Sequence, residues 1–112
     1  MPETYDFYAN PPQTREAIRE YYTSWLQPVT EREPKIINGR SFIQVNGFRR
    51  AFYIHSVWRC VEDGHYYWYV APDDRCDFAD FPTKSYASYE ALMDAVVEDY
   101  YNRWVATDYP TK

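Results

Sequence analysis

The sequence predicts an α+β domain in which an antiparallel meander of three or four strands is flanked by an N-terminal and a C-terminal helix. Two observations predict this class. Apolar residues recur at helical spacing near both ends of the chain. In the middle, three Asn-Gly or Asp-Gly pairs separate apolar runs, and such pairs are the strongest short-range hairpin signal. The 112 residues suit a single domain, 1–112, with residues 1–9 and 107–112 expected to be flexible ends.

The first helix is predicted over residues 11–26. Asn10 can cap it, Pro11 suits the first helical position, and Pro28 ends it. Its apolar stripe consists of Ala17, Ile18, Tyr21, Tyr22, Trp25 and Leu26. The stripe indicates a helix that packs one side against an apolar surface.

The strands are predicted at Lys35–Ile37, 40–45, 48–61 and 65–71. The turns between them fall at Asn38-Gly39, Asn46-Gly47 and Asp63-Gly64, because both central residues of a type I′ turn need positive φ. A two-residue turn at Asp63-Gly64 would pair Cys60 with Tyr67 and Trp58 with Tyr69.

Neither face of the last predicted hairpin is polar. One face carries Phe52, Ile54, Trp58, Cys60, Tyr67 and Tyr69; the other carries Tyr53, His55, Val57, Arg59, Val61, Tyr66, Trp68 and Val70. An antiparallel sheet with one solvated side should alternate apolar and polar residues. Either helices cover both faces, or one aromatic face is a binding surface.

The C-terminal helix is predicted from the cap Ser88 to about Val105, after an acidic loop over residues 73–84. Glu90, Asp94 and Glu98 are spaced by four residues and form a like-charged ridge. This acidic ridge is either a solvated face, a face toward the arginines of the meander, or a docking ridge for a basic partner.

Composition excludes several classes of protein. The chain holds 23 aromatic residues against 15 Ile, Leu and Val, so aromatic rings can build a core and disorder is not expected. No apolar stretch approaches the ~20 residues that span a bilayer, so no membrane partner is expected. Residues 1–10 include Glu3 and Asp6 and lack the apolar core of a secretory signal. A cytoplasmic location is therefore expected, with Cys60 and Cys76 as thiols rather than a disulfide.

The residues with reactive side chains do not form a known motif. His55, Cys60, His65 and Cys76 lack the close pairs that begin a zinc site, and His55 and Cys60 should face opposite sides of their strand. The acidic loop lacks the Gly and the distal Glu of an EF-hand. No metal, cofactor or catalytic residue is predicted, and a small enzyme using His55 or Cys60 is the second alternative function.

The charge pattern and the surplus of aromatics favour protein binding. The net charge is −5, yet residues 32–61 hold six basic residues and one acidic residue. Tyr, Trp and Arg dominate interface hot spots. We predict an adaptor, inhibitor or assembly factor that binds another protein or a second copy of itself. Its predicted partner face consists of Arg49, Arg50, Tyr53, Arg59, Tyr66 and Trp68. The first alternative is single-stranded nucleic acid stacked on the basic aromatic meander.

Overall fold

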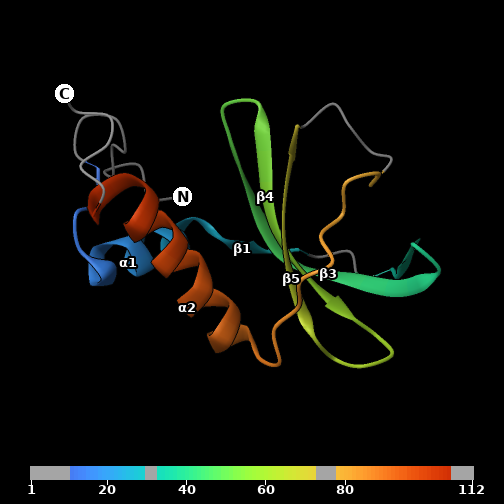
Figure 1. Cartoon of the computed structure of the whole chain (residues 1–112). Coiled ribbons are helices and arrows are strands. Elements are labelled where there is room, and N and C mark those ends of the chain that lie inside the picture. Colours follow the sequence, from blue (N-terminus) through green and yellow to red (C-terminus); the bar gives the residue numbers. More distant parts are fainter. Residues whose placement is uncertain (1–10, 30–32, 73–77, 107–112) are drawn as a thin grey trace. The chain divides into compact units, whose positions relative to one another are not determined.

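The computed structural model describes residues 11–29, 33–72 and 78–106 (Figure 1). Two helices and a five-stranded antiparallel sheet confirm the α+β class. Two compact units make up the chain. The sheet unit is Leu26–Leu92, and the helical unit joins residues 11–25 to residues 93–106.

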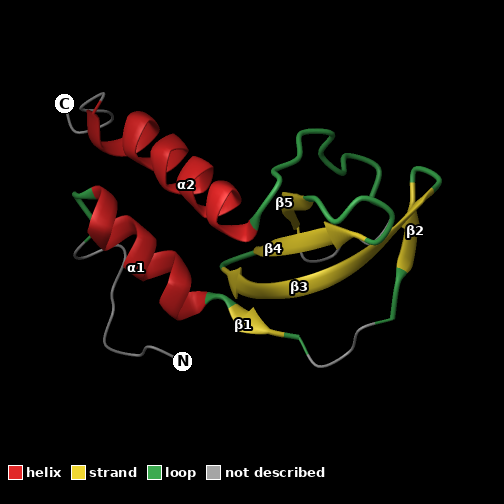
Figure 2. Ribbon diagram, turned by 90° about the horizontal axis from the view of Figure 1, so that it is seen from below, coloured by secondary structure: helices red, strands yellow, loops and turns green. Residues whose placement is uncertain are grey.

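The sheet unit is organised around one long strand. Its strands are β1 (Gln27–Pro28), β2 (Lys35–Ile37), β3 (Arg40–Arg50), β4 (Tyr53–Cys60) and β5 (Tyr66–Pro72). The order is β1-β3-β4-β5, and β2 pairs with β3 as well (Figure 2). β1 and β2 lie along the same edge of β3, at different positions. The sequence did not predict β1, because two residues that include a proline carry no strand signal.

Of the three predicted turns, the one at Asn38-Gly39 is confirmed. It joins β2 to β3 with φ values of 53° and 80°. Both residues therefore occupy the left-handed region that a type I′ turn requires.

The predicted turn at Asn46-Gly47 is wrong. Both residues lie inside β3, next to a register irregularity between Gln44 and Asn46. The chain turns instead at Ala51 and Phe52, where Ala51 has a φ of 57°. Gly47 is needed for space, because a Cβ there would lie 2.8 Å from the Gln44 side-chain nitrogen and 3.1 Å from the His55 carbonyl oxygen.

The predicted register between β4 and β5 is wrong by two residues. Trp58 pairs with Tyr67 and Ser56 with Tyr69, because the connection between the two strands spans five residues, 61–65, rather than two. The Asp63 side chain accepts a hydrogen bond from the His65 N–H at 2.9 Å, which stabilises the longer turn. A shift of two residues leaves each side chain within β4 and β5 on its predicted face, whereas Phe52 and Val61 lie in turns.

One sheet face, which we name the Trp58 face, holds the main core of this unit. Its buried cluster consists of Ile37, Phe42, Trp58, Cys60, Tyr67, Tyr69, Ala71 and Phe81, with Phe78 packed against it. Phe78 and Phe81 come from the region predicted as an acidic loop. The Phe81 N–H donates to the Phe78 carbonyl at 3.2 Å, and this tight turn places both rings on the sheet. Within this unit, a loop and not a helix packs on the Trp58 face.

The opposite face, which we name the His55 face, is also largely apolar. Val57 is fully buried on it and Phe48 nearly so. Tyr89, the first residue of α2 (Tyr89–Tyr100), packs edge to face on Tyr66 and accepts a hydrogen bond from the Asn46 side chain at 3.0 Å. The start of a helix therefore contacts this second aromatic face.

The helical unit pairs α1 (Arg15–Trp25) with α2, and Figure 1 shows the two side by side. The buried side chains of this unit are Ile18, Tyr21, Tyr22, Met93, Val96, Val97 and Tyr100. The rings of Tyr22 and Tyr100 meet edge to face with their centroids 6.3 Å apart. The two helices run antiparallel, because Arg15 pairs with Glu98 and Arg19 with Asp94.

The ends of both helices differ from prediction in part. α1 begins at Arg15, and Thr14 caps it by accepting the Ala17 N–H at 3.1 Å; the predicted cap Asn10 lies outside the described residues. The pair Pro11-Pro12 disfavours helix at the first proline, which explains the later start. The Ser88 cap is confirmed, with its hydroxyl accepting the Ala91 N–H at 3.1 Å. After α2 the chain continues as a π-helix over Tyr101–Ala106.

No helix in the described part of the chain combines the length and apolar character needed to cross a bilayer.

Candidate functional site

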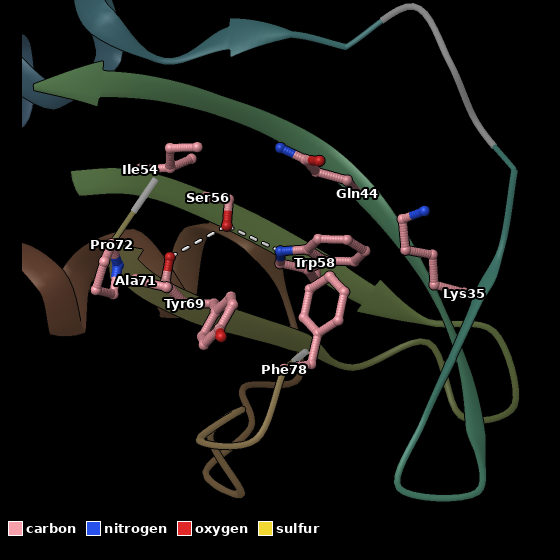
Figure 3. A pocket seen from close by; sticks show the side chains of 9 residues that line it. All are labelled: Lys35, Gln44, Ile54, Ser56, Trp58, Tyr69, Ala71, Pro72 and Phe78. Atoms are coloured by element: carbon pink, nitrogen blue, oxygen red, sulfur yellow. Dashed lines mark hydrogen bonds between the residues drawn. The ribbon is translucent and has the colours of Figure 1, made fainter. Parts of the chain in front are cut away.

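The Trp58 face contains an apolar pocket (Figure 3). Its volume is about 150 Å³, and its lining comes from all three long strands, from β2 and from the segment after β5. The lining residues are Lys35, Gln44, Ile54, Ser56, Trp58, Tyr69, Ala71, Pro72 and Phe78. The rings of Trp58 and Phe78 meet edge to face at 5.4 Å, and Tyr69 lies 5.7 Å from Phe78. Three aromatic rings therefore form much of the wall.

The polar atoms in the aromatic wall are already engaged within the protein. The Trp58 indole N–H donates to the Ser56 hydroxyl at 2.8 Å, and that hydroxyl donates to the Tyr69 carbonyl at 3.1 Å. The Tyr69 hydroxyl donates to Asp80 at 2.9 Å. The wall therefore presents ring faces and aliphatic carbons, and this chemistry favours an apolar occupant.

Basic residues lie near both ends of the pocket. Lys35 lines the end away from Ile54 and Pro72 (Figure 3). At the other end, Ile54 pairs directly with Arg49 across β3 and β4, so the Arg49 side chain lies on the same face. Lys35 is therefore the charged residue that lines the pocket, whereas Arg49 lies on the same face outside the lining.

Next to the pocket, the turn between β3 and β4 exposes a group of apolar side chains. We name Arg49, Arg50, Phe52, Tyr53 and Ile54 the hairpin end. Phe52 is 75 % exposed, Tyr53 49 % and Ile54 37 %. Large apolar side chains gathered at one place on a surface mark interaction sites more often than scattered ones do.

The predicted partner face is divided by the observed register. Arg50, Tyr53, Arg59, Tyr66 and Trp68 share the His55 face, whereas Arg49 lies on the Trp58 face. Arg50 and Tyr53 belong to the hairpin end, while Arg59 and Tyr66 pair near the other end of the hairpin. The sheet therefore brings five of the six residues to one face but not to one spot.

The acidic ridge lies on α2, and two of its three members face arginines of α1. Asp94 pairs with Arg19, and Glu98 pairs with Arg15. The hydrogen bond from Arg15 holds the pKa of the Glu98 carboxyl below its usual value. Both carboxylates contribute to helix pairing, and Glu90 is the remaining member of the ridge.

His55 lies on the His55 face, stacked on Phe48 with ring centroids 4.7 Å apart and planes within 9°. Burial, together with the positive charge of Arg50, lowers the pKa of His55 to about 4. Its Nδ1 atom is buried and has no hydrogen-bond partner among the described residues. The imidazole is therefore neutral at pH 7 and packs as an aromatic ring.

Cys60 lies on the Trp58 face, so it cannot meet His55, as the strand alternation predicted. The fully buried thiol accepts a hydrogen bond from Arg40 at 3.1 Å and donates to Glu62 at 3.4 Å. His65 is hydrogen-bonded to Ser85 at 3.0 Å. The described side chains contain no thiol–imidazole pair, and among them no three His, Cys, Asp or Glu residues could hold a metal ion.

Sequence reasoning missed the pocket as a unit. It singled out Trp58, Ile54 and Tyr69 as members of one face, but it did not assign Phe78 to the sheet or Lys35 to any site. The signal that could have found Phe78 is the run Phe78-Ala79-Asp80-Phe81, in which two aromatic residues stand within an acidic loop. Comparison with protein-family models, with curated proteins and with solved structures finds no match for this chain. Its function must be argued from the geometry.

Proposed function

We propose that the protein is a non-enzymatic protein-binding domain, an adaptor, inhibitor or assembly factor, whose partner contacts the hairpin end. One observation carries the proposal: Phe52, Tyr53 and Ile54 are consecutive, large, apolar and exposed. Burying such side chains contributes about 25 cal/mol per Å² of apolar surface. Arg49 and Arg50 beside them supply the residue type that is enriched, with aromatics, at interface hot spots.

The His55 face is a predicted second contact. Tyr53 belongs both to this face and to the hairpin end, and Trp68 is half-buried on the same face. A partner that covers Tyr53 could therefore extend along this face toward Trp68, Tyr66 and Arg59. The expected cytosolic location belongs to the same proposal, and Cys60 as a free buried thiol suits a reducing compartment.

The nucleic-acid alternative receives less support from the geometry. Arg40 and Arg49 lie on the Trp58 face, and Arg50 and Arg59 lie on the His55 face. Arg40 is also paired with Asp63 at 2.6 Å. A backbone-tracking groove needs its cations along one line. A titration with single-stranded oligonucleotide tests this alternative, and saturable, salt-sensitive binding would favour it over protein binding.

Affinity capture from native cells, quantified by mass spectrometry, tests the proposal. The wild-type chain is compared with a Phe52→Ser/Tyr53→Ser variant and with Ile36→Ser, a matched control that is 72 % exposed on β2. We expect specific partners to be retained by the wild type and the control and reduced about fivefold or more by the double variant. Equal capture by all three proteins would contradict a role for the hairpin end.

A further inference from the structure

We infer that the pocket on the Trp58 face receives one apolar side chain from an acidic segment of the partner protein. The inference rests on the proposed protein-binding function and names the chemistry of the segment that is bound. Three features of the site support it: the size of the pocket, the internal hydrogen bonds of the polar atoms in its aromatic wall, and the charge of Lys35 at one end.

The size of the pocket limits the occupant. Pockets for cofactors and metabolites usually measure about 300–1,000 Å³, whereas this cavity measures about 150 Å³. An apolar cavity of about 150 Å³ accommodates a group the size of benzene. The pocket therefore fits a single Phe- or Leu-sized side chain, which is how an anchor residue binds at a protein interface.

The wall of the pocket selects an apolar group. Trp58, Ser56 and Tyr69 satisfy one another or Asp80 with hydrogen bonds of 2.8–3.1 Å. A polar occupant would lose its hydrogen bonds to water and would not regain them from the donors and acceptors of these three residues. The lost hydrogen bonds would cost free energy. An aromatic occupant can instead make edge-to-face contacts with Trp58 and Phe78, like those the two rings make with each other.

The charge of Lys35, which lines one end of the pocket, favours an acidic neighbour for that side chain. The Trp58 face already packs a segment of this chemistry, because Asp80 lies between Phe78 and Phe81 in the chain's own loop. A partner segment with an apolar anchor and flanking carboxylates would complement both features.

The test titrates the full-length ¹⁵N-labelled chain with the peptide acetyl-Glu-Asp-Phe-Asp-Glu-amide. We expect saturable shifts of the Trp58 indole N–H and of the Ser56 and Gln44 amides. The same peptide with Ser in place of Phe should bind about tenfold or more weakly, because the buried ring is lost. Lys35→Glu should weaken binding about three- to tenfold. Lys84→Glu, a charge reversal at a residue that does not line the pocket, should leave binding unchanged.

Several outcomes would overturn the inference. These are the absence of shifts at the pocket, equal binding of the Phe and Ser peptides, or phenylacetate binding as tightly as the peptide, which would indicate a free small acid. Pocket resonances that move with protein concentration alone would indicate a second copy of the chain. A failure of the proposed function can be distinguished from a failure of this inference, because the test of the proposed function changes Phe52 and Tyr53, which do not line the pocket. Loss of capture by their double variant is independent of peptide binding.

Discussion

His55 is a titratable side chain held in one charge state by the fold. Its folded-state pKa is about 4, lowered by burial and by Arg50, whereas an unperturbed histidine titrates near 6.5. Between these pH values the unfolded chain binds more protons than the folded chain. The free energy of unfolding should therefore fall as the pH drops from about 6.5 to about 4, and the contribution of His55 is fully present only above that window.

Urea unfolding at about pH 7.5 and about pH 5 measures this dependence. The wild type should lose more stability between the two pH values than His55→Gln, which has no titrating ring. Gln13→Ala, which removes an exposed side chain that does not titrate, is the control and should retain the wild-type slope. An NMR titration that placed the pKa of His55 near 6.5 would contradict the prediction directly.

Ser56 is a buried polar residue, 3 % exposed, and its hydroxyl joins the wall of the pocket. Ser56→Ala would leave the buried Trp58 indole N–H without its acceptor. We expect the free energy of unfolding to fall by about 1–3 kcal/mol. Ser85→Ala, which removes a half-buried hydroxyl near His65, should cost less than about 1 kcal/mol. Equal losses in urea unfolding would show that the Trp58–Ser56 hydrogen bond is not what stabilises this wall.

Among the elements, the turn between β3 and β4 holds a non-glycine residue in the left-handed region. Ala51 has a φ of 57°, which costs an L-residue about 1–2 kcal/mol. Glycine removes that strain but increases the entropy of the unfolded chain. Ala51→Gly should therefore raise the free energy of unfolding by roughly 0.5–1 kcal/mol. Ala71→Gly, inside β5, should lower it by a similar amount. A destabilised Ala51→Gly variant in thermal or urea unfolding would contradict this account.

Local sequence signals predicted those elements whose stability is local. Asn38-Gly39 forms its turn, and Ser88 caps α2, because each depends on a few neighbouring residues. Asn46-Gly47 carries the same signal as Asn38-Gly39 but lies within β3, where it pairs with β1 and β4. The pairing of strands across the sheet outweighs turn preference at that position. Pattern alone cannot reveal this, because the strand partners are distant in sequence.

The whole molecule determines the candidate site, which explains why the sequence predicted only part of it. Alternation along β4 correctly placed Ile54 and Trp58 on one face, and the surplus of aromatics indicated either a second covered face or a binding surface. The pocket also needs Lys35 from β2 and Phe78 from beyond β5, and no spacing rule connects them. The hairpin end is exposed because the chain turns at Ala51. The sequence predicted this turn at Asn46-Gly47 and therefore did not indicate the exposure.

Charge segregation across the molecule allows a test of whether local or total charge controls recognition. The chain has a net charge of −5, so its overall charge repels an acidic peptide. Lys35 attracts it at short range, and ions screen charges over about 8 Å at physiological salt.

If the local cations dominate, the dissociation constant of the Glu-Asp-Phe-Asp-Glu peptide should increase about threefold or more between roughly 50 and 300 mM salt. If the net charge dominates, salt should tighten binding. A Gln-Asn-Phe-Asn-Gln peptide should show little dependence on salt, and Lys35→Glu should flatten the dependence of the acidic peptide. Tighter binding of the acidic peptide at high salt would mean that the basic residues around the pocket do not control recognition.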